Sequence, residues 1–191
     1  MTLTHDEALV RRRRFTVDDY HRMAAAGVLH EDDRVELIEG EVVVMSPIGN
    51  RHAACVDRLT ELLVHALARR AIVRVQNPLR LDRYSEPQPD LVVARRRDDF
   101  YAAGGPGPGD ALLAIEVGDS SVKFDRLVKA PLYARSGVQE VWLVDLGAEE
   151  VSVCRGPALE GYQDVQVRRR GEALPLAALP DVAVRVDDVL G

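Results

Sequence analysis

Ala111-Leu112-Leu113-Ala114-Ile115-Glu116-Val117 is an apolar run in which the one charged side chain is Glu116. A strand that is buried on both faces has this composition, and such strands occur in sheets covered by helices. A carboxylate at the end of such a strand is costly to bury unless it is paired or binds a metal ion. The run therefore predicts an α/β fold and marks Glu116 as a candidate functional residue.

A second stretch, Pro89-Asp90-Leu91-Val92-Val93, also sets one carboxylate beside an apolar run that has the pattern of a buried strand. Carboxylates at the ends of neighbouring strands can share a hard divalent cation. The helical pattern after Glu116 contains Lys129, and a lysine in such a place can orient or activate water for hydrolysis. Asp90, Glu116 and Lys129 together predict metal-dependent cleavage of a phosphodiester.

Lysine is rare in this chain. Of the 25 basic side chains, only Lys123 and Lys129 are lysines, and both follow Glu116. Arginine keeps its proton in proteins, whereas the pKa of a lysine falls readily in a low-dielectric site. The distribution favours a chemical role for one of these lysines, although two lysines that lie close together by chance would look the same.

The remaining patterns predict the elements around these two strands. A capping box formed by Thr16 and Asp19 begins a first helix, which Gly27 ends. Two β-rich runs on either side of Glu39-Gly40 predict a hairpin. The other expected elements are helices over residues 50–70 and 122–136, the second kinked at Pro131; strands over residues 71–81, 90–94, 139–145, 151–154 and 164–167; a loop over residues 102–110; and a loosely ordered strand or tail over the last 20 residues.

The composition is that of an ordinary globular protein, with 191 residues, 47% apolar and 29% charged. We expect an N-terminal arm over residues 1–14 and a single domain over residues 15–191. The arm has no apolar core of signal-peptide length, and no stretch approaches the ~20 apolar residues that span a bilayer. Cys55 and Cys154 form neither a close-spaced metal pair nor a disulfide framework. These features predict a cytoplasmic protein without membrane contact.

The net charge of −6 argues against a protein that coats nucleic acid without specificity. The arginines are nevertheless clustered, at residues 11–14, 69–70, 95–97 and 168–170. Arginine forks match phosphate oxygens, so clusters that converge on one face could bind a nucleic-acid backbone. Solvated loop ends paired with Asp and Glu are the alternative. The cluster at residues 95–97 directly follows the Asp90 strand, and we expect it near the proposed site.

An ordered set of motifs resembles the PD-(D/E)xK nuclease superfamily. Within it, the chain is most similar to the bacterial, Uma-type restriction-endonuclease-like family that was long catalogued as a domain of unknown function. The motifs are Glu36-Leu37-Ile38-Glu39-Gly40-Glu41, Met45-Ser46-Pro47, His52, Pro89-Asp90, Ile115-Glu116-Val117, Asp125 with Lys129, Tyr133-Ala134-Arg135-Ser136-Gly137-Val138 and Glu140-Val141-Trp142-Leu143-Val144-Asp145. A lone Pro-Asp pair carries no signal, whereas the ordered set is specific and covers most of the chain.

The resemblance implies a restriction-endonuclease-like core, a mixed β-sheet flanked by helices, with an N-terminal helix and hairpin and a C-terminal β extension. It implies that Asp90, Glu116 and the backbone carbonyl of Val117 bind Mg²⁺ or Mn²⁺. It also implies that Glu36 completes the metal site or binds a metal-ligated water. Period-two alternation places Glu36 on the opposite strand face from its apolar neighbours, which is compatible with a position in a cleft.

One position departs from the superfamily pattern, which places lysine two residues after the second acid. Gly118 occupies that position here. The likeness to the narrower family implies that Lys129 supplies the amine from the following helix, where one helical turn places it on the same face as Asp125. Lys123 is the second candidate. If neither lysine reaches the metal site, the fold would bind nucleic acid without cutting it.

For the other polar and aromatic residues, a structural role is expected rather than a role in the site. His52 matches a motif position, although a histidine at the start of a helix is more often a hydrogen-bonded partner than a ligand. Ser120 and Ser121 are expected to cap the following helix rather than to contact phosphate. Tyr133 and Trp142 are expected in the core.

The function implied is that of a Mg²⁺-dependent endodeoxyribonuclease whose catalytic residues are Glu36, Asp90, Glu116 and Lys129, with nucleic acid, foremost DNA, as its partner. Cutting two strands needs two sites related by a two-fold axis, so a homodimer is expected. Two other functions stay open. One is a catalytically inactive nuclease-like fold that binds DNA or another protein, and the other is a hydrolase for a different phosphorylated substrate.

Overall fold

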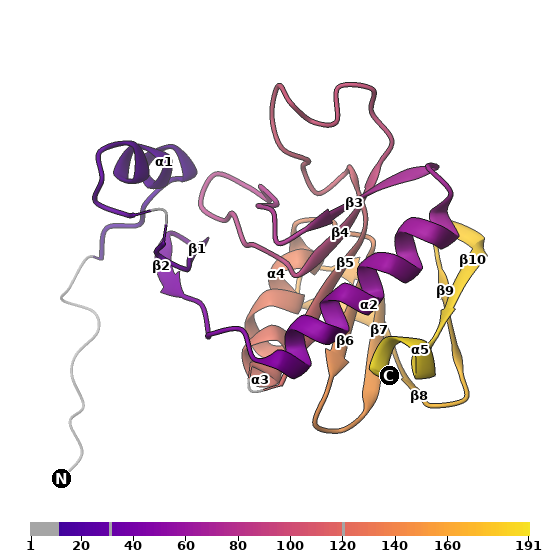
Figure 1. The fold of residues 1–191 in the computed structure, drawn as a ribbon. Coiled ribbons are helices and arrows are strands. Elements are labelled where there is room, and N and C mark those ends of the chain that lie inside the picture. Colours follow the sequence, from indigo (N-terminus) through magenta and orange to yellow (C-terminus); the bar gives the residue numbers. More distant parts are fainter. Residues whose placement is uncertain (1–11, 31, 120) are drawn as a thin grey trace, which may run out of the picture.

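A six-stranded mixed sheet lies at the centre of the computed structural model, which describes residues 12–30, 32–119 and 121–191 (Figure 1). In spatial order the strands are β3 (Ala71–Val75), β4 (Leu91–Arg95), β5 (Ala111–Gly118), β6 (Glu140–Asp145), β7 (Glu150–Ala158) and β8 (Gly161–Arg169). β5 and β6 run parallel, and the other neighbouring pairs are antiparallel. The mixed, helix-flanked sheet expected from the sequence is confirmed.

Both faces of the sheet are covered, as the apolar run in β5 predicts. One face packs against α2 (Asn50–Leu67), the hairpin of β9 (Ala173–Leu176) and β10 (Leu179–Arg185), and α5 (Val186–Leu190), while α4 (Ala130–Arg135) covers the other. Ile115 and Val117 belong to the core under α2. Because side chains alternate along a strand, Glu116 between them points toward α4.

An N-terminal helix and a hairpin lie to one side of the sheet (Figure 1). They are α1 (Val17–Ala25), β1 (Val35–Ile38) and β2 (Glu41–Val44), and the predicted capping box at Thr16 begins α1. The hairpin turns at Glu39 and Gly40, whose φ angles are 52° and 86°, and a two-residue type I′ turn requires positive φ at both positions. A bridge between Leu37 and Glu86 joins the hairpin to the segment before β4.

The helix expected over residues 122–136 has three consecutive segments. They are α3 (Val122–Phe124), a π-helical turn η2 (Asp125–Lys129) and α4. The N–H of Ala130 donates to the carbonyl of Asp125, five residues earlier, and Pro131 lies in the first turn of α4. Proline lacks an N–H and interrupts the regular ladder, so the distortion predicted at Pro131 takes the form of a wider turn just before it.

Of the loosely ordered strand or tail expected over the last 20 residues, the strand is correct, while the tail and the loose order are wrong. The residues from 173 onward form β9, β10 and α5, and Leu174, Leu176, Val184 and Val189 are buried. These strands bury only every second residue, and their partner is α2, more than a hundred residues away in the sequence. A pattern this short has no local signal that separates it from a tail. The strands predicted over residues 151–154 and 164–167 lie within β7 and β8, which pair as a hairpin, and β8 is an edge strand of the central sheet.

The expectation that the arginines at residues 95–97 lie near the acids is also wrong. β4 starts directly after Asp90 and ends at Arg95, so roughly 16 Å of extended chain separate them. Arg95 to Arg97 are exposed at the far end of the strand.

Two further features bear on the expectations from composition. Cys55 in α2 and Cys154 in β7 are free thiols and are buried. Within the described part of the chain, no helix is long and apolar enough to cross a bilayer.

Candidate active site

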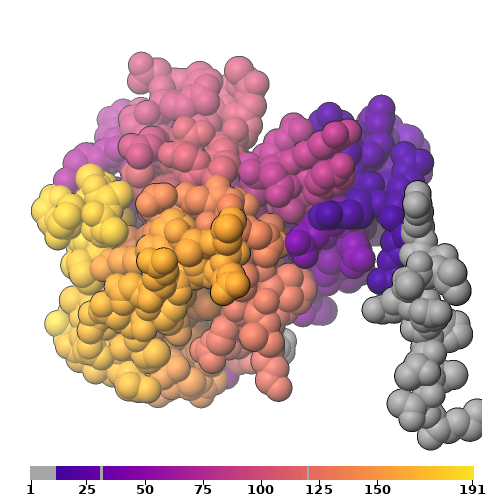
Figure 2. Space-filling model, turned by 180° about the vertical axis from the view of Figure 1, so that it is seen from behind, coloured from indigo at the N-terminus to yellow at the C-terminus, as the bar shows by residue number. Residues whose placement is uncertain are grey.

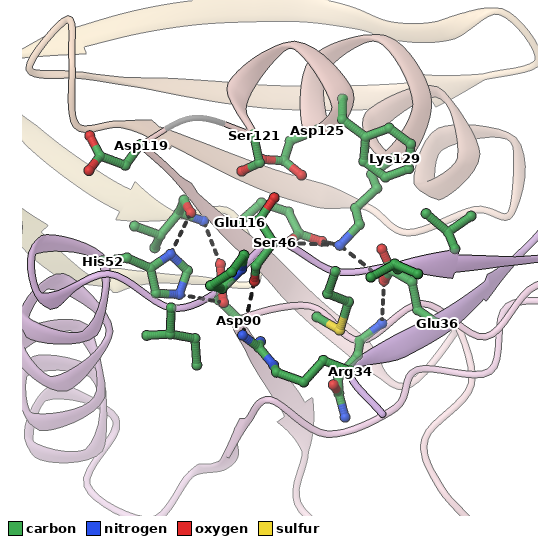
Figure 3. Close-up of a pocket in the computed structure, with 18 of the residues that line it drawn as sticks. Arg34, Glu36, Ser46, His52, Asp90, Glu116, Asp119, Ser121, Asp125 and Lys129 are labelled. Carbon is green, nitrogen blue, oxygen red and sulfur yellow. Dashed lines mark hydrogen bonds and ion pairs between the residues drawn. The ribbon is translucent and has the colours of Figure 1, made fainter. Parts of the chain in front are cut away.

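A cavity of about 530 Å³ lies between the β1–β2 hairpin, the start of α2, the end of β5 and the helix that follows β5 (Figure 3). Five carboxylates line it, and four of them are buried: Glu36, Asp90, Glu116 and Asp125. The buried amine of Lys129 lies among them. The structure thus brings together the four catalytic residues expected from the sequence, Glu36, Asp90, Glu116 and Lys129, although they come from separate segments.

Asp90 and Glu116 lie opposite each other on neighbouring strands. Leu91 pairs with Ile115 in the antiparallel register of β4 and β5, so Asp90, one residue before β4, faces Glu116. The N–H of Val117 donates to Oδ2 of Asp90 at 2.8 Å. This bond fixes one of the two acids against the strand that carries the other.

Lys129 joins the hairpin to the central sheet. Its Nζ lies 3.1 Å from Oε2 of Glu36 and 3.3 Å from Oε1 of Glu116. Figure 3 shows Lys129 pointing between these two carboxylates. Glu36 also accepts the N–H of Gln88 at 3.0 Å, and the hydroxyl of Tyr133 donates to Oε1 of Glu116 at 2.5 Å. Glu36 lines the cavity, in agreement with the alternation of side chains along its strand.

The cavity holds an excess of negative charge, and the pKa values follow from it. Burial raises the pKa of Glu116 well above its ordinary value; Asp125, Asp90 and Glu36 push it further up, and Lys129 offsets only part of this effect. Burial likewise raises the pKa of Asp125, against the opposing effects of Lys129 and of the Ser121 hydroxyl. These carboxylates therefore lie in a site that favours a bound proton or a bound cation.

The state of Lys129 corrects one expectation from the sequence. Burial alone would lower the pKa of this lysine, but the charges of Glu116, Glu36 and Asp125 outweigh burial and raise it above its ordinary value. These charges favour the ammonium form of Lys129, which can donate hydrogen bonds and stabilise negative charge.

His52, at the start of α2, contacts two groups of the site at once. Its Nδ1 lies 2.9 Å from the carbonyl oxygen of Val117, and its Nε2 lies 3.0 Å from Oδ1 of Asp90. The second approach is close but is not aligned as a hydrogen bond. The Asp90 carboxylate is the largest cause that raises the pKa of His52 above its ordinary value. The histidine thus holds the acid and the carbonyl in place from the side of α2.

Gly118 departs from the superfamily pattern for a steric reason. A Cβ atom at this position would lie 2.5 Å from Cγ2 of Val122 and 3.0 Å from the Val122 backbone nitrogen. The chain turns here directly into α3, so no side chain fits. Lys129 reaches the acids instead, while Lys123 lines the cavity from an exposed position.

The sequence analysis missed the contributions of two side chains, Tyr133 behind Glu116 and Arg34 in the cavity wall. Tyr133 is buried as expected, yet its hydroxyl serves Glu116, and its spacing of four residues from Lys129 is the signal that could have found it. Arg34 lines the cavity and donates to the carbonyl of Ser46 at 2.9 Å. Arg34 is two residues before Glu36, so period-two alternation places both on one face. Ser121 has no capping bond of its own side chain and donates to Asp125 instead.

The donors present suit a hard divalent cation. Within the described residues, no three Asp, Glu, His or Cys side chains form a ready-made metal cage. Mg²⁺ rarely uses such a cage, because it is usually bound by one or two carboxylates and keeps several waters. Asp90, Glu116 and the Val117 carbonyl supply oxygen donors of this kind, and the carbonyl has a second lone pair beside the one that His52 uses.

Comparison with known proteins identifies the family. Residues 17–187 match the model of the Uma2 family, described as "Putative restriction endonuclease". The chain belongs to this family. The resemblance inferred from the ordered motifs is confirmed.

A solved structure with a similar fold comes from Anabaena variabilis ATCC 29413 and is described as a "putative nuclease belonging to DUF820". The two structures superpose with a TM-score of 0.70 at 16% sequence identity, over 92% of this chain and 97% of that chain. At this level of identity the likeness establishes a common fold. No curated protein matches the chain.

Proposed function

We propose that this Uma2 chain is a divalent-metal-dependent endonuclease that hydrolyses phosphodiester bonds in DNA. The observation that carries the proposal is the charge imbalance in the cavity. Four buried carboxylates converge there, and the basic side chains in direct contact with them are Lys129 and, when it is protonated, His52. Buried carboxylates without compensation are costly, and a divalent cation would offset the excess. The family and the nuclease fold support a nucleic acid as the substrate.

Asp90, Glu116 and the carbonyl of Val117 would hold Mg²⁺ or Mn²⁺, because hard cations prefer oxygen donors. When bound, the cation polarises the scissile phosphate and lowers the pKa of a bound water. His52 contacts both Asp90 and the Val117 carbonyl and would help to keep these two donors side by side.

Lys129 would position the attacking water and stabilise the charge that develops on the phosphate. An ammonium ion in a buried site donates strong hydrogen bonds to oxygen without reorganisation. Glu36 holds this ammonium from the hairpin side, and both of its contacts, to Lys129 and to the N–H of Gln88, use Oε2. Its Oε1 would accept a hydrogen bond from water in the cavity.

Arg34 supports a substrate with more than one phosphate. Its guanidinium lines the same cavity as the acids and would suit a phosphate next to the scissile one, because arginine forks match phosphate oxygens. A nucleic-acid backbone offers such a neighbouring phosphate, whereas a small phosphomonoester does not.

Nicking of supercoiled plasmid in Mg²⁺ or Mn²⁺ tests the proposal. Asp90→Asn and Glu116→Gln keep the shape of each side chain and remove its charge, so each should lower the rate on the order of 10²-fold or more. Glu41→Gln is the matched control, since Glu41 is exposed on β2 next to the β1 strand of Glu36. Cleavage that persists in Asp90→Asn would contradict the proposal.

A second candidate function is a nuclease-like fold that binds DNA or protein without cutting it, and Gly118 in the place of the superfamily lysine favours it. Binding of Mn²⁺, followed by electron paramagnetic resonance, separates the two candidates. The nuclease should bind Mn²⁺ through Asp90, and Asp90→Asn should weaken binding. A scaffold has no reason to bind the ion there.

A further inference from the structure

β8 forms one edge of the central sheet, with β7 as its neighbour on the inner side. Residues 163–167 of this nine-residue strand are exposed, including Val165 (55%) and Val167 (38%). Figure 2 shows this region, in orange, on the open face of the molecule. A long edge strand offers a row of N–H and C=O groups to another strand, and proteins usually guard such edges with charges or proline. Two exposed valines on it therefore call for an explanation.

The sequence of the strand complements itself. It reads Gln163-Asp164-Val165-Gln166-Val167-Arg168-Arg169. If a second copy pairs antiparallel about a two-fold axis at Gln166, Val165 lies opposite Val167 of that copy. In the same register Asp164 lies opposite Arg168. Apolar pairs and opposite charges at directly facing positions stabilise antiparallel strands.

Other registers lose these matches. In an antiparallel ladder every second residue directs its backbone groups outward, so two identical strands can pair only residues of the same parity. An axis at Val165 would place Asp164 opposite Gln166. An axis at Val167 would place Val165 opposite Arg169. The axis at Gln166 is the register in which both kinds of pair form.

The contacts that β8 makes within its own chain leave this pairing possible. Arg168 lies 3.1 Å from Glu172, and the two side chains are 34% and 43% exposed. Exposed ion pairs of this kind contribute little, so Arg168 can exchange its partner. The backbone of β8 keeps its ladder with β7 on the other side.

We propose that β8 is a homodimer interface at which two copies pair antiparallel about Gln166 and join their sheets into one continuous sheet. The interface is isologous, with the same strand on both sides of a two-fold axis. It is independent of the proposed nuclease activity, because its test is the oligomeric state.

Charge reversal tests the proposed register, with sedimentation equilibrium of the full chain as the measurement. The wild type should dimerise. Asp164→Arg places like charges opposite each other at both symmetric pairs, and Arg168→Asp does the same with the opposite sign. Each should raise the dissociation constant at least tenfold, and the double variant should restore the dimer. Circular dichroism of each variant verifies that the exposed changes leave the fold intact.

Cysteine cross-linking gives an independent test. Gln166→Cys lies on the two-fold axis, where facing Cα atoms of antiparallel strands are about 4.5–5.5 Å apart, within the range of a disulfide. Gln163→Cys is the matched control, because its two copies would be roughly 20 Å apart. The native cysteines are buried, so oxidation should give a covalent dimer for Gln166→Cys alone.

Three results would overturn the proposal. They are a wild type that stays monomeric at all concentrations, a dimer that Asp164→Arg does not weaken, and cross-linking of Gln163→Cys as efficient as that of Gln166→Cys.

Discussion

Glu116 is the residue at which stability and the proposed function oppose each other. Burial and three neighbouring acids raise its pKa despite Lys129, so the folded chain holds its proton more tightly than the unfolded chain does. Ionisation of Glu116 therefore begins to lower the stability of the fold once the pH exceeds the pKa of Glu116 in the unfolded chain. The full cost is present above the pKa of Glu116 in the folded chain. We predict that Glu116→Gln lowers the cleavage rate on the order of 10²-fold or more yet raises the free energy of unfolding by about 1 kcal/mol at neutral pH.

Urea unfolding at a series of pH values checks this prediction. The advantage of Glu116→Gln should shrink as the pH falls through the folded pKa, because wild-type Glu116 then takes up its proton. Glu41→Gln, a change at an exposed site, should stay within about 0.5 kcal/mol of the wild type. A Glu116→Gln variant less stable than the wild type at neutral pH would show that the ion pair with Lys129 outweighs the repulsion.

Gly118 has no side chain, and this explains why the amine of the site comes from Lys129. Gly118→Ala would bring a Cβ to 2.5 Å from Val122, and we predict a loss of about 1–3 kcal/mol in unfolding free energy. Gly147→Ala is the matched control, since a Cβ there lies 3.4 Å from its nearest neighbour, an ordinary contact. Equal stability of the two variants in thermal or urea unfolding would refute the steric explanation.

The sequence predicts the helices and strands that have a local signal, such as a periodic apolar pattern or a capping motif. The apolar run of β5 and the capping box at Thr16 are of this kind, and both are confirmed. The acids could be placed because each adjoins such a run. The pattern could not show that Tyr133 serves Glu116 or that Lys129 carries a raised pKa. Those properties arise from charges that different segments bring together.

The C-terminal hairpin and α5 have no local sequence signal, and their contribution to the stability of the fold can be measured. We predict that Leu176→Ala costs about 2–5 kcal/mol, because this side chain is buried against the sheet. Leu159→Ala should change stability by less than about 0.5 kcal/mol, since Leu159 is 85% exposed at the β7–β8 turn. Chemical denaturation of the two variants measures the difference. Similar small losses for both would mean that the C-terminal segment is a tail after all.

At the scale of the whole molecule, the proposed metal site exists only when the fold is complete. β4, β5 and α2 each bring part of it: Asp90 adjoins β4, Glu116 and Val117 lie in β5, and His52 in α2 contacts Asp90 and the Val117 carbonyl. A ligand that binds the folded state alone stabilises it, by about 2.7 kcal/mol at a hundred times its dissociation constant. We predict that Mn²⁺ raises the Tm of the wild type and that a chelator reverses the effect.

Thermal unfolding with and without Mn²⁺ measures this linkage, and Asp90→Asn provides the comparison. The variant should unfold at a Tm that Mn²⁺ does not change. A rise of the same size in Asp90→Asn would place the ion elsewhere on the molecule.

The most direct test is a pair of lysine variants in the plasmid-nicking assay with Mg²⁺ or Mn²⁺. Lys129→Met removes the buried ammonium between Glu36 and Glu116, and Lys123→Met makes the same chemical change at an exposed position of the same cavity. We predict that Lys129→Met loses cleavage on the order of 10²-fold or more and that Lys123→Met keeps it. Metal-dependent cleavage that survives in Lys129→Met, or that is lost in Lys123→Met alone, would contradict a catalytic centre built on Asp90, Glu116 and Lys129.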